Sequence, residues 1–461
     1  MELYDLTNPQ KSIWLTEQFY RGTSINVICG TVLIDDIVNF DVLSKAINIF
    51  LKDNDSFRIK LCLDENGEVK QFFQDFCEKH FDVLNVSNNI ELKNLEKEIA
   101  TSPFNILGDA LFSITPFQIL TGKGGFIVKA HHIIADACTA SLVASKIMTT
   151  YSSILNEDEE IKSIPTSYIN YINSENEYLN SPKFEKDKEY WEEQFQTVPE
   201  FGVIPSLIES SAESSHAERQ VFEIDNFLLN NINSFCKDNK LSLFNFFMAI
   251  YAIYIGKVSN LNDFILGTPI LNRTTFLEKN TPGMFISTVP FKFCIQNDKT
   301  FVEFAQKISL DSLSMFRHQK YPYQNILEHI RKSKPNQPNL YDILISYQNS
   351  KTNRNSCEVP YSVNWTFNGN VADSMQIHIF DMNDEGSLNV AYDFRLNKYS
   401  LADIHNIHHR ILNIINQILM SSNITLGKIN IVTYDEKDLI LNKRLLIFLK
   451  NKLKKIRIIL L

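Results

Sequence analysis

Glycine and proline are scarce in this chain, with 14 of each among 461 residues, roughly half the usual share. Long flexible linkers and low-complexity tails are therefore excluded. The seven cysteines are scattered and form no CxxC pair, so we expect reduced thiols and no metal site. A signal peptide and a run of about 18 uncharged apolar residues that could span a bilayer are also lacking. We therefore expect a cytoplasmic protein.

Basic residues are not in excess either. The chain has 45 Lys and Arg residues against 54 Asp and Glu residues, a net charge of −9, and the two signs are interspersed. This balance argues against nucleic acid as a partner. Hydrophobic residues make up 44% of the sequence, which is typical of a globular protein. At about 150 residues per domain, the length allows two or three domains, each with its own core.

Several enzyme signatures are missing from the sequence. There is no GxSxG elbow, no GxxxxGK[ST] loop, no GxGxxG after a strand and no HExxH pair. Serine hydrolases, P-loop enzymes, dinucleotide enzymes and zincins therefore lose support. We expect that the protein itself binds neither a cofactor nor a metal.

Strand and helix patterns alternate, which predicts an α/β fold (of α+β type). Residues 27–34 are rich in β-branched side chains and predict a strand, whereas 40–51 have the apolar spacing of a helix. A strand at 126–130 and a buried helix at 137–154 follow. The pattern restarts in the second half, with predicted strands at 219–224, 264–268, 343–347 and 388–394 and predicted helices at 227–236, 241–255 and 401–420.

A long polar stretch near residues 172–215 separates the two halves. We therefore predict an N-terminal lobe at 1–175, a connector at 176–215, a C-terminal lobe at 216–440 and a tail at 441–461. Residues 443–461 contain seven Lys or Arg and no acid. Such a tail could lie on an anionic membrane, but we favour a C-terminal helix or a linker and do not expect membrane contact.

The segment 130–137, Ala-His-His-Ile-Ile-Ala-Asp-Ala, carries the clearest chemistry. Because neighbouring strand residues face opposite sides, we expect His132 to face a cavity and His131 to face the protein interior, so the pair does not suit one metal. A helix start at Ala137 would keep a nearby imidazole neutral and offer a backbone N–H to a developing oxyanion. The set favours acyl transfer with His132 as the base.

Each residue also has a simpler interpretation. Asp136 fits a helix N-cap, and His131 fits a structural histidine. His132 taken alone fits a partly buried histidine without a function, and only the spacing of the three residues favours catalysis. The pair His408 and His409 serves as a comparison, because it lies in a predicted helix with no acid four residues later and is interpreted as part of a helix face.

Further segments, in order along residues 3–440, resemble the motifs of a condensation domain of nonribosomal peptide synthetases, in the chloramphenicol acetyltransferase-like superfamily, whose hallmark is HHxxxDG. These segments are TNPQKSIWL at 7–15, NDSFR at 54–58, SYINY at 167–171, GTPILNR at 267–273, GMFISTVP at 283–290, HQKYPY at 318–323 and the strand at 342–349. The HxxxD pattern alone is a weak signal, whereas seven ordered matches are a strong one.

The resemblance implies two acetyltransferase-like lobes arranged as a V-shaped pseudo-dimer with a central tunnel. It implies amide bond formation between a donor acyl or peptidyl thioester and the amine of an acceptor aminoacyl thioester. Both substrates would be carried on the phosphopantetheine of donor and acceptor peptidyl carrier proteins, with an adenylation domain as a further partner.

The resemblance also implies roles for individual residues. His132 would take the proton of the acceptor amine or orient that amine, while His131 and Asp136 would hold the loop. A buried arginine would pair with Asp136, with Arg273 as the first candidate and Arg58 as the second.

Three residues depart from the family pattern: Ala137 replaces a glycine, Ser287 an asparagine and Asn170 an aspartate. Two alternatives therefore stay open. One is a catalytically impaired domain that only docks carriers. The other is a stand-alone acyltransferase that uses acyl-coenzyme A or a lipid or small-molecule acceptor.

Overall fold

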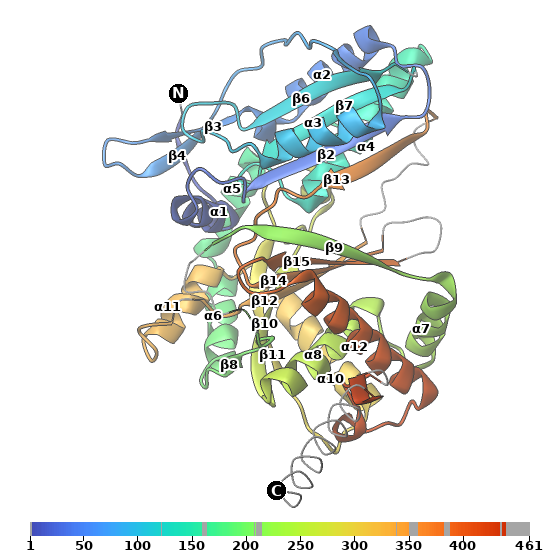
Figure 1. Ribbon diagram of the computed structural model, residues 1–461. Helices are drawn as coiled ribbons and strands as arrows, with labels where there is room; N and C mark the ends of the chain where they lie inside the picture. Colours follow the sequence, from blue (N-terminus) through green and yellow to red (C-terminus); the bar gives the residue numbers. More distant parts are fainter. Residues whose placement is uncertain are drawn as a thin grey trace, which may run out of the picture.

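Two β-sheets, each packed against helices, divide the protein into two lobes (Figure 1). The computed structural model describes residues 2–120, 122–158, 164–206, 208, 214–337, 339–349, 358–381, 388–433 and 436–438. Within these residues the fold is a mixed α/β fold, which confirms the predicted class. The predicted tail at 443–461 lies outside the described residues.

The first lobe is built on a five-stranded sheet. Its strands follow the order β13 (Tyr361–Thr366), β2 (Val27–Ile34), β7 (Gly124–His131), β6 (Phe112–Ile119) and β5 (Leu84–Val86). Helices α2 (Phe40–Asp53) and α4 (Ala137–Leu155) pack together on one face, and α3 (Asn89–Thr101) covers the other. Strand β2 and helices α2 and α4 confirm the predictions for 27–34, 40–51 and 137–154.

The second lobe is built on a seven-stranded sheet. Its order is β11 (Ser287–Cys294), β10 (Asp263–Ile270), β12 (Ile343–Gln348), β14 (Met375–Phe380), β15 (Leu388–Arg395) and β9 (Ala217–Ile224), and β8 (Glu200–Phe201) pairs with β10. The helices α7 (Asn226–Asp238), α8 (Leu243–Ser259), α10 (Phe301–Arg317) and α12 (Leu401–Met420) lie on one face, and the other face is turned toward the first lobe (Figure 1).

Shorter elements surround the two sheets. A small sheet joins β1 (Tyr4–Asp5), β4 (Val69–Phe73) and β3 (Ile59–Leu63). The remaining helices are α1 (Asn8–Phe19), η1 (Asp55–Arg58), α5 (Ile169–Leu179), α6 (Pro182–Gln194), α9 (Phe276–Asn280), α11 (Tyr323–Arg331) and η3 (Leu426–Lys428).

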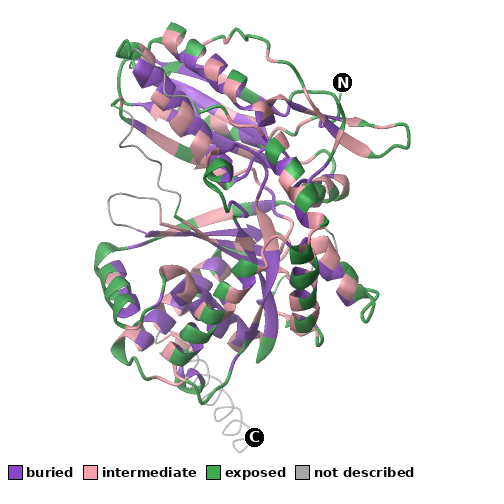
Figure 2. Ribbon diagram, turned by 180° about the vertical axis from the view of Figure 1, so that it is seen from behind, coloured by how far each residue is buried: buried purple, intermediate pink, exposed green. Residues whose placement is uncertain are grey.

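The hydrophobic core of the second lobe surrounds α8, whose residues 246–256 are all buried (Figure 2). A helix that is apolar on every side is stable only when its whole circumference is covered. Among the described residues no single helix is long and apolar enough to cross a membrane, and only the pair α7 and α8, bent by 103°, meets that test by length and composition.

Strand β13 crosses from the second half of the sequence into the first lobe. It pairs antiparallel with β2, where Trp365 lies opposite Gly30. We predicted that residues 216–440 form the C-terminal lobe, and β13 corrects this prediction, because it belongs to the sheet of the first lobe. Local sequence patterns do not reveal which sheet a strand joins. The other lobe boundaries stay predictions.

Gly283 and Tyr168 form a close contact beside the interface of the lobes. Gly283 has φ of +156°, and a Cβ there would lie 2.3 Å from the ring of Tyr168. The Tyr168 hydroxyl donates to the carbonyl of Met284 at 2.5 Å and lies 3.1 Å from the Oγ1 of Thr7. Only glycine therefore fits between α5 and the segment that leads into β11.

We predict that Gly283→Ala lowers the free energy of unfolding by roughly 2–4 kcal/mol, since the new methyl group must displace a fully buried ring and the backbone conformation favours glycine. Chemical denaturation would measure this loss. Gly67→Ala is the matched control, because Gly67 has φ of +78° with nothing within 4 Å and should lose only about 1 kcal/mol. Equal losses of unfolding free energy in the two variants would contradict the close contact between Gly283 and Tyr168.

Candidate active site

His131 is the last residue of β7 and faces the interior of the first lobe. Its ring is buried, with Nε2 lying 3.3 Å from Oε2 of Glu17 and Nδ1 accepting from the N–H of Ile133 at 3.1 Å. Asn26 also donates to Glu17, at 2.7 Å. Burial raises the pKa of Glu17, but the hydrogen bonds from His131 and Asn26 outweigh it and lower the pKa overall. Every polar atom of the His131 ring is thus occupied in holding the loop.

His132 follows the strand and is only half-buried. Its backbone N–H donates to the carbonyl of Asn26 at 2.7 Å, which fixes the position of the residue. Its Nδ1 atom is buried without a hydrogen-bond partner. Burial lowers the pKa of the imidazole, and the nearby Asp136 opposes this shift only in part. The ring is therefore neutral at pH 7 and can accept a proton.

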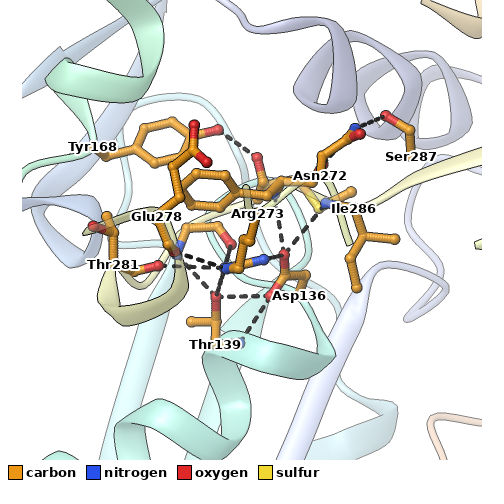
Figure 3. A network of polar contacts seen from close by, with 12 residues as sticks. Asp136, Thr139, Tyr168, Asn272, Arg273, Glu278, Thr281, Ile286 and Ser287 are labelled. Atoms are coloured by element: carbon orange, nitrogen blue, oxygen red, sulfur yellow. Dashed lines mark hydrogen bonds and ion pairs between the residues drawn. The ribbon is translucent and has the colours of Figure 1, made fainter. Parts of the chain in front are cut away.

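Asp136 caps α4 and also holds the second lobe (Figure 3). Its Oδ1 accepts from the N–H and the hydroxyl of Thr139 at 2.8 and 2.9 Å. Its Oδ2 forms an ion pair with Arg273 and accepts the backbone N–H groups of Phe285 and Ile286 at 3.1 and 3.3 Å. The N-cap and the salt bridge expected from the sequence are thus made by one carboxylate.

The Asp136–Arg273 pair is closed to water, with side-chain exposures of 0% and 1%. Arg273 also donates to the carbonyls of Glu278, Thr281 and Gly283 at 3.1–3.3 Å, and its guanidinium lies 4.0 Å from the centre of the Phe285 ring. Burial raises the pKa of Asp136, but the charge and hydrogen bonds of Arg273 outweigh this effect and lower it. Both groups are therefore charged.

Arg58 was the second candidate for this pair, and that prediction is wrong. Its guanidinium donates to the carbonyls of Leu51, Lys52 and Gln74 at 2.6–3.0 Å. The carbonyls at the end of α2 lack partners inside the helix, and Arg58 satisfies them. Its role is therefore to join α2 to β4.

Several residues that hold the loop were not singled out from the sequence. Gln10 of α1 is fully buried and donates to the carbonyl of Ile133 at 3.0 Å. Thr139 accepts from the N–H of Gly283 at 2.9 Å, across the lobe boundary. Gln10 and Gly283 lie within segments that resemble family motifs, so the resemblance could have identified them as candidates. Glu17 and Thr139 carry no such signal, because their partners are distant in sequence.

The three departures from the family pattern are accommodated locally. Ala137 is exposed at the first position of α4 and is not among the described residues with positive φ, so its methyl group causes no backbone strain. Ser287 accepts a hydrogen bond at 2.9 Å from Asn272, a residue with φ of +52°. Asn170 is exposed on α5. The contribution of the Ala137 N–H to an oxyanion site stays a prediction.

Comparison with known proteins identifies the family. The sequence model of the condensation-domain family matches residues 1–441. The chain belongs to the condensation-domain family. Condensation domains are acyltransferase-type enzymes that form amide bonds in nonribosomal peptide synthetases.

Two relatives from Bacillus subtilis (strain 168) are similar to this condensation domain over most of its length. Surfactin synthase subunit 1 is 32% identical over 95% of this chain and 12% of the relative. A plipastatin synthase protein is 27% identical over 95% of this chain and 17% of the relative. The chain thus spans less than a fifth of the length of these relatives.

Solved condensation domains show the same fold. A variant of the starter condensation domain of rhizomide synthetase, in complex with C8-CoA, matches with a TM-score of 0.78 at 17% identity, covering 93% of this chain and 97% of that one. The first condensation domain of the calcium-dependent antibiotic synthetase, in complex with a substrate analogue, has a TM-score of 0.79 at 14% identity, covering 94% and 100%.

We predict that Arg273→Met and Asp136→Asn each lower the free energy of unfolding by about 3–5 kcal/mol, because each leaves one buried charge or its hydrogen-bond partners unsatisfied. The double variant should lose clearly less than the sum of the two single losses, since neither charge is then stranded. Urea denaturation of the four proteins measures this difference. Strict additivity would show that the two groups do not act as a pair.

Proposed function

We propose that His132 is the catalytic histidine of amide bond formation in this chain. The acceptor amine attacks the carbonyl carbon of the donor thioester, so that a C–N bond forms and the C–S bond breaks. His132 takes the proton of the amine or orients it, and that proton ends on the departing thiolate. A neutral, half-buried imidazole four residues before the N-cap of α4 carries this proposal.

His131 and Asp136 position this imidazole and do not touch the substrate. Their buried contacts with Glu17 and Arg273 fix the loop before and after His132. The first-turn N–H groups of α4 lack partners inside the helix, so the N–H of Ala137 is proposed to stabilise the oxyanion of the tetrahedral intermediate.

The substrates are proposed to arrive on the phosphopantetheine arms of a donor and an acceptor peptidyl carrier protein, in the cytoplasm, with an adenylation domain as a further partner. The synthase proteins that resemble the chain are more than five times as long as the matched region. This length leaves room for carrier and adenylation domains beside the condensation domain, which supports the proposal. The reaction would take place in a passage between the lobes. Positioning two tethered reactants lowers the activation barrier by about 7–11 kcal/mol at best. A general base raises the rate roughly 100- to 10,000-fold, which corresponds to a barrier lower by only about 3–5 kcal/mol.

Acyl-coenzyme A is a second candidate donor. A solved relative with the same fold is in complex with C8-CoA, which favours a domain that accepts an acyl group directly from coenzyme A. The acceptor would then still be an aminoacyl group on a carrier protein. Product from coenzyme A thioesters and free amines alone would instead favour the stand-alone acyltransferase.

We predict that His132→Ala lowers the rate of amide formation roughly 100- to 10,000-fold, because the general base is lost while the reactants are still positioned. Mass spectrometry of product formed from loaded donor and acceptor carriers measures the rate. His409→Ala, on the exposed side of α12, is the matched control and should keep the wild-type rate. Product at the wild-type rate from His132→Ala would end the proposal.

A second prediction concerns pH. The base must be neutral to accept a proton, so the rate falls as the pH drops through the pKa of His132. Because burial lowers that pKa below its ordinary value of about 6.5, the acid limb of the rate profile should lie below pH 6.5. Single-turnover rates from pH 5 to 8, each divided by the fraction of the acceptor amine that is neutral at that pH, would measure it. A limb above pH 6.5 in these corrected rates would contradict a desolvated His132 as the base.

A further inference from the structure

A cavity of the second lobe lies between α6, β11 and α10. It has a volume of about 460 Å³, which is within the roughly 300–1,000 Å³ of small-molecule sites. No residue of the segment 130–137 and none of the residues that contact Asp136 or Arg273 lines it, so the cavity is separate from the candidate active site. Its floor consists of buried aromatic side chains: Trp191, Phe195, Phe291, Phe293 and Phe304.

The backbone of β11 borders this cavity. Among the strands that the structure describes, β11 pairs only with β10 and is an edge of the seven-stranded sheet. The consecutive residues Pro290–Cys294 all line the cavity. Because neighbouring strand residues face opposite sides of a sheet, an unbroken run places the open edge of the strand, and not one of its faces, along the cavity.

Two backbone N–H groups of this edge point away from β10. The N–H of Ile295 donates to the carbonyl of Asn262 at 2.8 Å, across the pairing of the two strands. Residues of an antiparallel pair alternate between bonding to the partner strand and pointing away from it, so Lys292 and Cys294 point away. Pro290, which has no N–H, shares this orientation. Within the described ranges no hydrogen bond uses the N–H of Lys292 or Cys294, so both can donate to a ligand.

The charged side chains around the cavity leave one positive charge in excess. Lys299 lies 3.6 Å from Glu303, and Lys307 forms an ion pair with Asp311. All four residues line the cavity, and Lys292 is the fifth charged residue of the lining. Its side chain is half-buried and forms no ion pair with any residue that the structure describes. The lining therefore offers an ammonium group to an anion.

An extended peptide fits this edge less well than a compact ligand does. Proline and lysine on an edge strand are common protections against the addition of another strand, and Pro290 and Lys292 both lie on this edge. Pro290 also removes one donor from any ladder that a peptide could form. A small ligand with one anionic group needs only the ammonium of Lys292 and one of the free N–H groups.

We propose that this cavity binds an aromatic carboxylic acid as its anion. The carboxylate pairs with the ammonium of Lys292 and accepts from a free N–H of β11, as charge-assisted hydrogen bonds favour. The aromatic ring packs on the aromatic floor of the cavity. An aromatic amine would bring a second positive charge beside Lys292, and an aromatic amide would gain no ion pair. The proposal does not involve His132, so a failure of the proposed function would leave it standing.

The test is calorimetric titration with three probes that share one ring system: 2-naphthoate, 2-naphthamide and 2-naphthylmethylammonium. The wild-type protein should bind one naphthoate per chain, more tightly than naphthamide, and should not bind the ammonium. Lys292→Met should weaken naphthoate binding roughly three- to tenfold and leave naphthamide binding unchanged, because only the charge is removed. Lys257→Met is the matched control, since Lys257 is also half-buried but does not line the cavity, and it should bind as wild type does.

A second pair of variants tests the cavity itself. Gln194 lines the cavity and is half-buried, whereas Gln196 is exposed and does not line it. Gln194→Trp should fill part of the space and weaken both naphthoate and naphthamide several-fold. Gln196→Trp makes the same change two residues away and should leave both affinities unchanged. Photolabelling of the wild-type protein with a diazirinyl benzoate, followed by peptide mass spectrometry, should mark residues of α6, β11 or α10.

Several results would overturn the proposal. These are the absence of saturable naphthoate binding, equal affinity for naphthoate and naphthamide, and photolabels confined to other parts of the chain. Binding of a blocked, extended tetrapeptide in place of naphthoate would show that the edge accepts a strand instead. A misfolded Lys292→Met protein would lose naphthamide as well as naphthoate, so it could not imitate support. The wild-type titrations and the photolabelling need no variant and decide the question in that case.

Discussion

The buried ion pair between Asp136 and Arg273 joins the loop of His132 to the second lobe. Removing two charges from water is costly and is offset only where hydrogen bonds satisfy both groups. Here the carboxylate accepts from Thr139, Phe285 and Ile286 as well as from the arginine. The start of α4, the start of β11 and the loop of His132 therefore take their relative positions from one carboxylate.

Strand β13 supplies a second, independent link between the lobes. Its pairing with β2 makes it part of the same sheet as β7, which ends at the loop of His132. The next strand in sequence, β14, belongs to the sheet of the second lobe. The chain therefore passes between the lobes at this point, and the connection from β13 to β14 limits how the lobes can move relative to each other.

Local patterns in the sequence predicted the elements that border the site but not most of its long-range contacts. Strand β2 and helix α4 follow from periodicity, and the turn of His131 into the interior follows from strand alternation. The choice between Arg273 and Arg58 rested on motif resemblance, because no local signal reports which of two distant arginines meets a carboxylate. Glu17 and β13 were missed for the same reason, since their partners are far away in sequence.

The unpartnered Nδ1 of His132 follows from how the nearby carboxylates are used. Asp136 is committed to Arg273 and Glu17 to His131, so neither carboxylate forms a hydrogen bond with the His132 ring. The charge of Asp136 only partly opposes the lowering of the His132 pKa by burial. A strong base is not needed, because an α-amino group has a pKa near 7.7–8.0 and a substantial fraction is neutral at physiological pH. The neutral amine is already nucleophilic and requires only a nearby acceptor for the proton it loses. The buried charges of the site therefore hold the loop in place, and one desolvated imidazole is left for the proposed reaction.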